Sequence, residues 1–217
     1  MQDNVILSIR NDYDRLAEEY ARRIFDELQG KPLDRELLNR FAADVNGRGD
    51  VCDIGCGPGH VARYLHDAGT TIFGLDLSPG MLKQARKLNP GLIFREGNMM
   101  ALNLPDGILA GIVAFYSIAN IPNEFLPVVF GEMQRVLQPG GSLLLAFHMG
   151  DGTTHEQELW GHPLAMDFFF FQPAEIQRLL EGAGFSVEEI VERDPYSPDV
   201  EHQSRRAYIF ARKPVAG

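Results

Sequence analysis

The chain has 217 residues, of which 45% are hydrophobic and 23% are charged, as in ordinary soluble globular proteins. Its formal net charge of −10 argues against a nucleic-acid-binding surface, which needs a basic face, and its apolar runs are far shorter than the ~20 residues of a membrane span. Two cysteines give no disulfide framework and residues 1–10 show no signal-peptide pattern, so we expect one cytoplasmic domain.

The chain is expected to begin with two helices. An apolar stripe predicts the first over residues 11–28, with Asn11 or Asp12 as its cap. Gly30 and Pro32 end it and start a second helix that runs to about residue 45. On this stripe, Tyr20 fits a packed core position and a ligand-covering position equally well.

Residues 50–60 read D-V-C-D-I-G-C-G-P-G-H, which predicts a buried strand, a glycine-rich turn and a helix over residues 61–68. The alternate glycines Gly55, Gly57 and Gly59 let a ligand approach the backbone closely, and the helix aims unpaired N–H groups at it. Asp53 ends the strand with a carboxylate, which would repel a phosphate and attract a cationic group.

A second acid, Asp76, ends the strand predicted over residues 71–78. It lies 76 − 55 = 21 residues beyond Gly55, about the separation at which an acid binds ribose hydroxyls in dinucleotide sites. The dinucleotide fingerprint also needs glycine at its sixth position, where this chain has His60. The pattern therefore predicts a site for a nucleoside joined to a positively charged group, without a pyrophosphate.

The later elements continue the alternation of strands and helices. We expect strands at 92–95, 108–115, 142–147, 185–192 and 207–212, and helices at 81–88, 123–137 and 174–183. Such alternation predicts one doubly wound α/β domain with a mostly parallel sheet of seven strands and helices on both faces. Ligands bind at the carboxyl ends of such strands, where Gly55, Asp76, Asn98 and Tyr116 fall.

Residues 148–172 interrupt this alternation and are predicted to form an insert that roofs an acceptor pocket. The insert contains His148, two further histidines and the single tryptophan, Trp160. Because side chains alternate across a strand, at most two rings of the run 168–171 face the pocket, and we assign Phe169 and Phe171. Each histidine is more often a surface or core residue than a substrate contact.

Four motifs occur in order: D-x-G-x-G-x-G at 53–59, GLDLS at 74–78, EGNM at 96–99 and VLQPGG at 136–141. This series resembles the class I S-adenosylmethionine-dependent methyltransferases, from residue 13 to 147 and more weakly beyond. The resemblance implies their Rossmann-like fold, with an antiparallel last strand. It divides the domain into N-terminal helices (1–48), a cofactor-binding core (49–147), the insert (148–172) and a closing helix and strands (173–217).

The resemblance also implies roles for residues at matching positions. Asp53 would lie near the ammonium of the methionine moiety, Asp76 would bind the ribose and Asn98 the adenine amino group. Leu77 and Met99 would sandwich the adenine ring, and the N-terminal helix would lie over the cofactor. The remaining cofactor contacts in this assignment are Tyr20, Gly55, Cys56, Gly57, Gly59, Met81, Gly97, Tyr116 and Ser117.

The predicted activity is transfer of a methyl group from S-adenosylmethionine to a small molecule by in-line displacement. The sulfonium carries the chemistry, so no catalytic residue needs to stand out. His148, at the end of a strand, is the candidate general base, and we assign it to the acceptor pocket with Tyr116, Trp160, Phe169 and Phe171. A small acceptor is favoured because the chain lacks the motifs of DNA and arginine methylases.

Two other functions remain open at this point. One is a non-catalytic binder of the same cofactor. The other is an NAD-dependent oxidoreductase, which His60 and the absence of a recognisable Tyr-x-x-x-Lys pair disfavour. A metal site is not expected, because Cys52 lies in a strand and Cys56 in a turn, so that these residues and His60 share no helical face.

Overall fold

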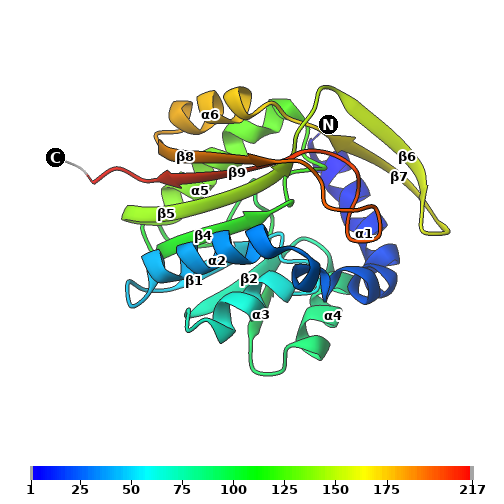
Figure 1. The fold of residues 1–217 in the computed structure, drawn as a ribbon, viewed down its shortest axis with the longest axis horizontal. Helices are drawn as coiled ribbons and strands as arrows, with labels where there is room; N and C mark the ends of the chain where they lie inside the picture. Colours follow the sequence, from blue (N-terminus) through cyan, green and yellow to red (C-terminus); the bar gives the residue numbers. More distant parts are fainter. Residues whose placement is uncertain (1, 216–217) are drawn as a thin grey trace.

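The computed structural model describes residues 2–215 and contains the predicted α/β fold (Figure 1). Its seven-stranded sheet has the order β3-β2-β1-β4-β5-β9-β8. Neighbouring strands from β3 to β5 are parallel, whereas β9 is antiparallel to both β5 and β8, which confirms the predicted antiparallel last strand. The strands are β1 (Val51–Ile54), β2 (Ile72–Asp76), β3 (Ile93–Glu96), β4 (Leu109–Phe115), β5 (Leu137–His148), β8 (Ser186–Arg193) and β9 (Arg206–Arg212).

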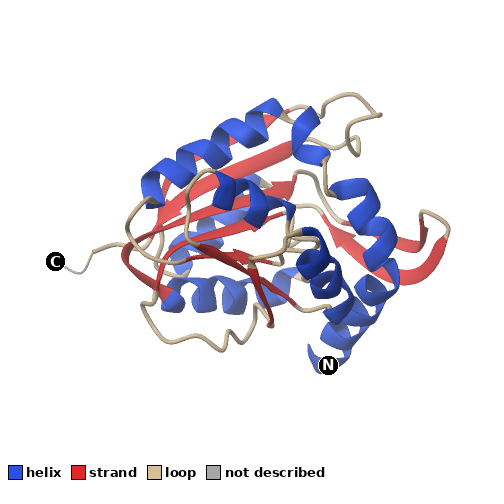
Figure 2. Cartoon of the chain, turned by 90° about the horizontal axis from the view of Figure 1, so that it is seen from below, coloured by secondary structure: helices blue, strands red, loops and turns tan. Residues whose placement is uncertain are grey.

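Helices cover both faces of this sheet, as Figure 2 shows. One apolar cluster joins β4 and β5 to α5 and α6, and a second joins the opposite face to α2, α3 and α4. The helices are α1 (Gln2–Ile24), α2 (Pro32–Val45), α3 (His60–Asp67), α4 (Pro79–Leu88), α5 (Leu126–Val136) and α6 (Pro173–Gly182), with short 3-10 helices at Glu27–Gly30 and Asn123–Phe125. In the described part of the chain, no helix is long and apolar enough to cross a membrane.

The first helix differs from its prediction at both ends. The helix already includes Gln2, whereas we expected it to begin near residue 11. Its apolar stripe is longer than predicted because Ile6 and Ile9 extend it and pack against the larger core cluster. Asp12 does not cap the helix: it lies inside it, is 2% exposed and pairs with Arg15 one turn later. The predicted last turn becomes a separate 3-10 helix.

The predicted insert forms a hairpin of its own, β6 (Thr153–Leu159) paired with β7 (His162–Phe169). It packs on α1 through a small apolar cluster that contains Leu16, Leu164 and Met166. Figure 1 shows α1 and the hairpin together at one end of the sheet. They form a cover beside the carboxyl ends of the parallel strands.

A buried charge cluster, which we define as Lys31, Asp34, Arg193, Glu201 and Arg206, ties the loop before β9 to the start of α2. The guanidinium of Arg193 lies 3.0 Å from a carboxylate oxygen of Asp34 and also pairs with Glu201. Glu201 lies 3.5 Å from Lys31 and 3.4 Å from Arg206. Three cations therefore share one carboxylate in the interior.

Candidate functional site

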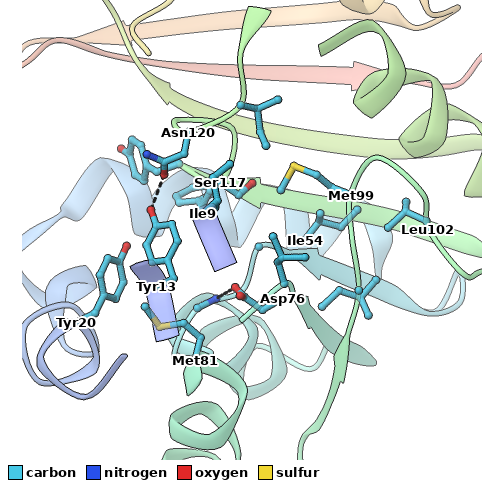
Figure 3. A pocket seen from close by; sticks show the side chains of 18 residues that line it. Ile9, Tyr13, Tyr20, Ile54, Asp76, Met81, Met99, Leu102, Ser117 and Asn120 are labelled. Carbon is cyan, nitrogen blue, oxygen red and sulfur yellow. Dashed lines mark hydrogen bonds between the residues drawn. The ribbon is translucent and has the colours of Figure 1, made fainter. Parts of the chain in front are cut away.

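The candidate site is a cleft at the carboxyl ends of β1, β2 and β4, partly covered by α1 (Figure 3). It encloses about 730 Å³ of empty space, part of which is open to solvent. Of the predicted cofactor residues, those that line the cleft are Tyr20, Gly55, Gly57, Asp76, Leu77, Met81, Gly97, Met99, Tyr116 and Ser117.

The glycine-rich turn forms the floor of the cleft with a backbone that side chains would obstruct. Gly55, Gly57 and Gly59 have φ values of 72°, 51° and 81°, in the left-handed region that favours glycine. A Cβ atom at Gly55 would lie 2.4 Å from the Cβ of Ser117. The backbone is therefore bare where the turn meets the cleft.

Alanine at Gly55 or at Gly47 would be strained by the positive φ of the backbone, but only at Gly55 would its Cβ also clash with Ser117. We therefore expect Gly55→Ala to lower the free energy of unfolding by about 1–3 kcal/mol more than Gly47→Ala does. Gly47 is the matched control, since its φ is 70° and a Cβ atom added there would meet no atom of a non-adjacent residue within 4 Å. Urea unfolding of the two variants measures the difference. Equal destabilisation would show that the contact with Ser117 relaxes without cost.

Asp76 brings a carboxylate to the wall of the cleft. Its Oδ2 accepts a hydrogen bond of 2.8 Å from Gly57 N–H (Figure 3), and its Oδ1 accepts one of 2.8 Å from Ser78 N–H. Burial raises the pKa of this carboxyl to about 6, against the effect of these hydrogen bonds. Each carboxylate oxygen offers two lone-pair sites, so both retain acceptor capacity for a ligand.

We expected Asp53 to lie close to the ligand, but it does not line the cleft. It is 1% exposed, and its Oδ2 accepts a hydrogen bond of 3.1 Å from Ala62 N–H in the first turn of α3. It therefore satisfies one of the N–H groups at the start of α3 that have no partner within the helix. Burial raises the pKa of this carboxyl to about 7.

Three other predicted cofactor residues also lie outside the lining. Cys56 is buried in the core, and Gly59 faces Phe94 and Asn89. The side-chain oxygen of Asn98 accepts a hydrogen bond of 2.9 Å from Met100 N–H, which closes a local turn. Local hydrogen bonding and packing thus occupy positions that the motif alone assigns to ligand contact.

The cleft includes residues that the motifs did not assign to it, among them Ile9, Tyr13 and Asn120. The Tyr13 hydroxyl donates to the Asn120 side chain at 2.6 Å, and Asn120 donates to the backbone carbonyl of Asp167 at 2.7 Å. This chain of bonds joins α1, the loop after β4 and strand β7. A sequence signal existed for Tyr13, which lies two helical turns before Tyr20 on the same stripe.

The predicted acceptor residues separate into two groups. Tyr116 lines the cleft, and the ring of His148 lies beside it, with centroids 5.0 Å apart. The ring of Trp160, on the hairpin, lies beside the ring of Tyr20 with centroids 5.8 Å apart. Phe169 lines a second hollow with Glu124 and Asp151. Neither of these two lines the main cleft.

We assigned the ring of Phe171 to the acceptor pocket, but the structure places it in the core. It is completely buried and packs edge-to-face on Phe147, with centroids 6.1 Å apart. Its backbone bridges to Met149 at the end of β5, so the chain re-enters the core there. The alternation rule selected a ring on the wrong side because strand β7 ends at Phe169.

The cleft suits the nucleoside sulfonium that the motifs predict. Ser117 Oγ is buried and has no hydrogen-bond partner among the described residues, so a polar ligand group would satisfy it. Apolar side chains of Leu77, Met81 and Met99 offer faces for a flat ring, and Asp76 offers acceptors for hydroxyls. Within residues 2–215, no cluster of three or more His, Cys, Asp or Glu could hold a metal ion.

Comparison with known proteins gives a consistent result. Residues 51–141 match the model of a family described as a methyltransferase domain. A probable S-adenosylmethionine-dependent methyltransferase of Mycolicibacterium smegmatis is 32% identical over 163 residues, which cover 70% of this chain and 58% of that protein. A trans-aconitate 2-methyltransferase of Methylobacterium nodulans is 40% identical over 118 residues, covering 50% of this chain and 41% of that protein. The chain spans less than two thirds of the length of such curated relatives.

Experimental structures share the fold at lower sequence identity. The complex of DhpI with SAH matches 99% of both chains with a TM-score of 0.75 and 20% identity. A methyltransferase of Methanosarcina mazei covers 77% of this chain and 93% of its own, with a TM-score of 0.69 and 19% identity. The matched domain, the relatives and the shared fold together show that this chain belongs to the class I S-adenosylmethionine-dependent methyltransferases, whose cofactor is S-adenosylmethionine.

Proposed function

We propose that this chain transfers the methyl group of S-adenosylmethionine to a small-molecule acceptor by in-line displacement. The observation that carries the proposal is the cleft itself, which is lined by the acid Asp76, the bare turn at Gly55 and Tyr116. This arrangement offers the cofactor a carboxylate, an open stretch of backbone and an aromatic ring in one space. The bound cofactor supplies a methyl group on a cationic sulfur.

In this proposal, the chain's own residues bind, orient and exclude water. Asp76 accepts hydrogen bonds from the ribose hydroxyls, and Leu77 and Met99 pack on the two faces of the adenine ring. Tyr13 and Tyr20, held on α1 beneath the hairpin, cover the cleft. Displacement at a sulfonium depends mainly on alignment and water exclusion, which such a cover favours.

The names of the relatives support an acceptor that is small or borne by a carrier protein. They include trans-aconitate 2-methyltransferases and malonyl-[acyl-carrier protein] O-methyltransferases. Both names describe methyl transfer to an organic acid. We extend to this chain only the class of small-molecule or carrier-borne acceptor.

The proposal is tested by incubating the protein with S-adenosylmethionine labelled in its methyl group and a small-molecule extract of bacterial cells. We expect label in low-molecular-weight products and formation of S-adenosylhomocysteine. A protein that binds S-adenosylhomocysteine tightly and transfers no label would instead be a non-catalytic binder. Stabilisation by NAD in a thermal-shift assay, without stabilisation by S-adenosylhomocysteine, would favour the oxidoreductase.

The buried carboxyl of Asp76 predicts that cofactor binding strengthens as pH rises. The pKa values of Asp53 and Asp76, about 7 and about 6, lie above the ~4 of an unfolded aspartate, so the folded chain binds more protons between about pH 4 and 7. These groups therefore make the free protein less stable as pH rises through that window. A ligand that hydrogen-bonds to the ionised form of Asp76 restores the stability that ionisation removes. Its binding therefore stabilises the protein more at higher pH.

We expect the rise in melting temperature caused by S-adenosylhomocysteine to increase between pH 5 and pH 7.5, measured by differential scanning fluorimetry. Asp76→Asn is the control, because its amide does not titrate and it should flatten the increase. A shift that is constant with pH in the wild-type protein would contradict binding to the ionised carboxylate.

A further inference from the structure

The hairpin of β6 and β7 has a strained residue at its tip, which consists of Trp160 and Gly161 between the paired residues Leu159 and His162. Both tip residues have positive φ values, 54° and 83°, the combination found in a type I′ turn. Asparagine, aspartate or glycine usually takes the first of these positions, because the left-handed region crowds a bulky side chain. Among the non-glycine residues that the structure describes, only Tyr116 also has a positive φ. Such strain persists where other contacts compensate for it, so the contacts of the Trp160 ring are informative.

The ring of Trp160 packs against the last turns of α1. Its centroid lies 5.8 Å from that of Tyr20, with the ring planes inclined at 54°, and Cζ of Arg23 lies 5.0 Å from the centroid of the Trp160 ring. Residues three apart on a helix are neighbours on one face, so Tyr20 and Arg23 present a ring and a cation to the same side. Aromatic pairs and cation–π contacts at such distances are favourable. The strained tip of the hairpin therefore binds α1 at Tyr20.

Tyr20 connects this contact to the cleft. Its side chain lines the cleft, and its Cε1 atom lies 3.8 Å from the position that a Cβ atom at Gly57 would take. The N–H of Gly57 in turn donates to the carboxylate of Asp76. The ring of Tyr20 also meets the ring of Tyr13 edge-on, with centroids 5.9 Å apart (Figure 3). Tyr20 therefore contacts the tip of the hairpin and lies at the glycine-rich turn that lines the cleft.

The body of the hairpin is held by other contacts. Leu164 and Met166 of β7 are buried and pack in one apolar cluster with Leu16 of α1. These residues lie outside the turn, so their packing does not depend on the ring of Trp160. Loss of that ring is therefore expected to release the tip and leave the hairpin folded on α1.

We propose that Trp160 is a positioning residue that holds Tyr20 at the turn of Gly57 and so retains the bound cofactor in the cleft. The inference deepens the proposed function and rests on binding of the cofactor in this cleft. Contacts that hold Tyr20 in place slow the movement of α1 away from the turn, and with it the release of the cofactor. Trp160 thereby has a role other than the acceptor contact that the sequence suggested.

The type I′ turn supplies a variant that removes the ring without straining the fold. Trp160→Asn introduces a residue that the turn favours, so we expect a melting temperature within about 4 °C of the wild-type value. The Kd for S-adenosylhomocysteine and its dissociation rate should each rise about 3- to 10-fold, as expected for loss of an aromatic pair. Trp160→Phe keeps a ring and should lose less, and Gln157→Ala, at an exposed position of β6, should lose nothing. Titration calorimetry and stopped-flow displacement measure both constants, and unchanged values in Trp160→Asn would overturn the proposal.

A double-mutant cycle tests whether Trp160 acts through Tyr20. We expect Trp160→Asn to weaken the binding of S-adenosylhomocysteine in the wild-type background and to cause no further loss in the Tyr20→Leu background. Losses that add in the double variant would show that Trp160 acts by another route, and would overturn the proposal. Trp160→Gly, which also suits the turn, completes the cycle should Trp160→Asn fail to fold.

Fluorescence reports on the contact directly, because Trp160 is the single tryptophan of the chain. We expect saturating S-adenosylhomocysteine to reduce the quenching of Trp160 by acrylamide, and this reduction to vanish in Tyr20→Leu. Quenching that the bound ligand leaves unchanged would overturn the inference and leave the methyltransferase function standing. Absence of methyl transfer, with binding and quenching as expected, would overturn the proposed function alone. A wild-type protein that does not bind S-adenosylhomocysteine would overturn both.

Discussion

Asp76→Ala is expected to weaken the binding of S-adenosylhomocysteine by about tenfold or more. The substitution deletes one or two charge-assisted hydrogen bonds to the ribose, each contributing about 1.5–3 kcal/mol, and about 1.4 kcal/mol corresponds to a tenfold change in affinity. It also removes the acceptor for Gly57 N–H and so frees the glycine-rich turn. Isothermal titration calorimetry measures the change.

Asp67→Ala is a suitable control for this measurement, because Asp67 is an exposed residue at the end of α3 that pairs only with Arg63 among the described residues. We expect it to leave the affinity unchanged. If Asp76→Ala also bound the ligand as tightly as the wild-type protein, the assignment of Asp76 to the ribose would be wrong.

The second large effect is expected in the buried charge cluster. Asp34 is completely buried and accepts hydrogen bonds from Tyr208 OH at 2.7 Å and Arg193 at 3.0 Å. Asp34→Ala leaves a buried guanidinium with fewer partners, so we expect the free energy of unfolding to fall by about 3–5 kcal/mol. Urea or thermal unfolding measures this loss.

Asp44→Ala on the same helix is the matched control. Asp44 also pairs with an arginine, Arg212, but its side chain is 38% exposed. Ion pairs at the surface contribute about 0–1 kcal/mol, so the loss should be correspondingly small. A loss for Asp34→Ala no larger than that for Asp44→Ala would show that the buried pairs contribute little to stability.

The core of the fold was predictable because its signals are local. Short apolar runs, glycine turns and helical stripes repeat along the chain, and helix α2 begins and ends at the predicted residues 32 and 45. Asp76 and the turn at Gly55 line the cleft for a similar reason, since each lies at the end of a predicted strand.

Side-chain directions were not predictable from the same patterns. Asp53 ends its strand as expected, but its carboxylate bonds to Ala62 rather than lining the cleft. Phe171 follows the end of β7, so strand alternation does not govern its direction. In each case tertiary packing, which no local motif encodes, decides which side chain reaches the cleft.

The surroundings of Tyr116 come from residues far apart in the sequence. Lys31 and Arg206 are 206 − 31 = 175 residues apart and approach the same ring, that of Tyr116. Neither belongs to a recognisable motif. His148 was proposed from its position at the end of a strand, and its contact with Ser204 comes from a loop 56 residues later in the chain.

We propose that the cleft binds the cofactor with its ribose on Asp76 and its sulfur toward Tyr116. A crystal structure of the protein with S-adenosylhomocysteine tests this most directly. We predict ribose hydroxyls within hydrogen-bonding distance of the Asp76 carboxylate, adenine between Leu77 and Met99, and the sulfur near Tyr116. Adenosine bound elsewhere, or a ribose that does not contact Asp76, would contradict the assignment.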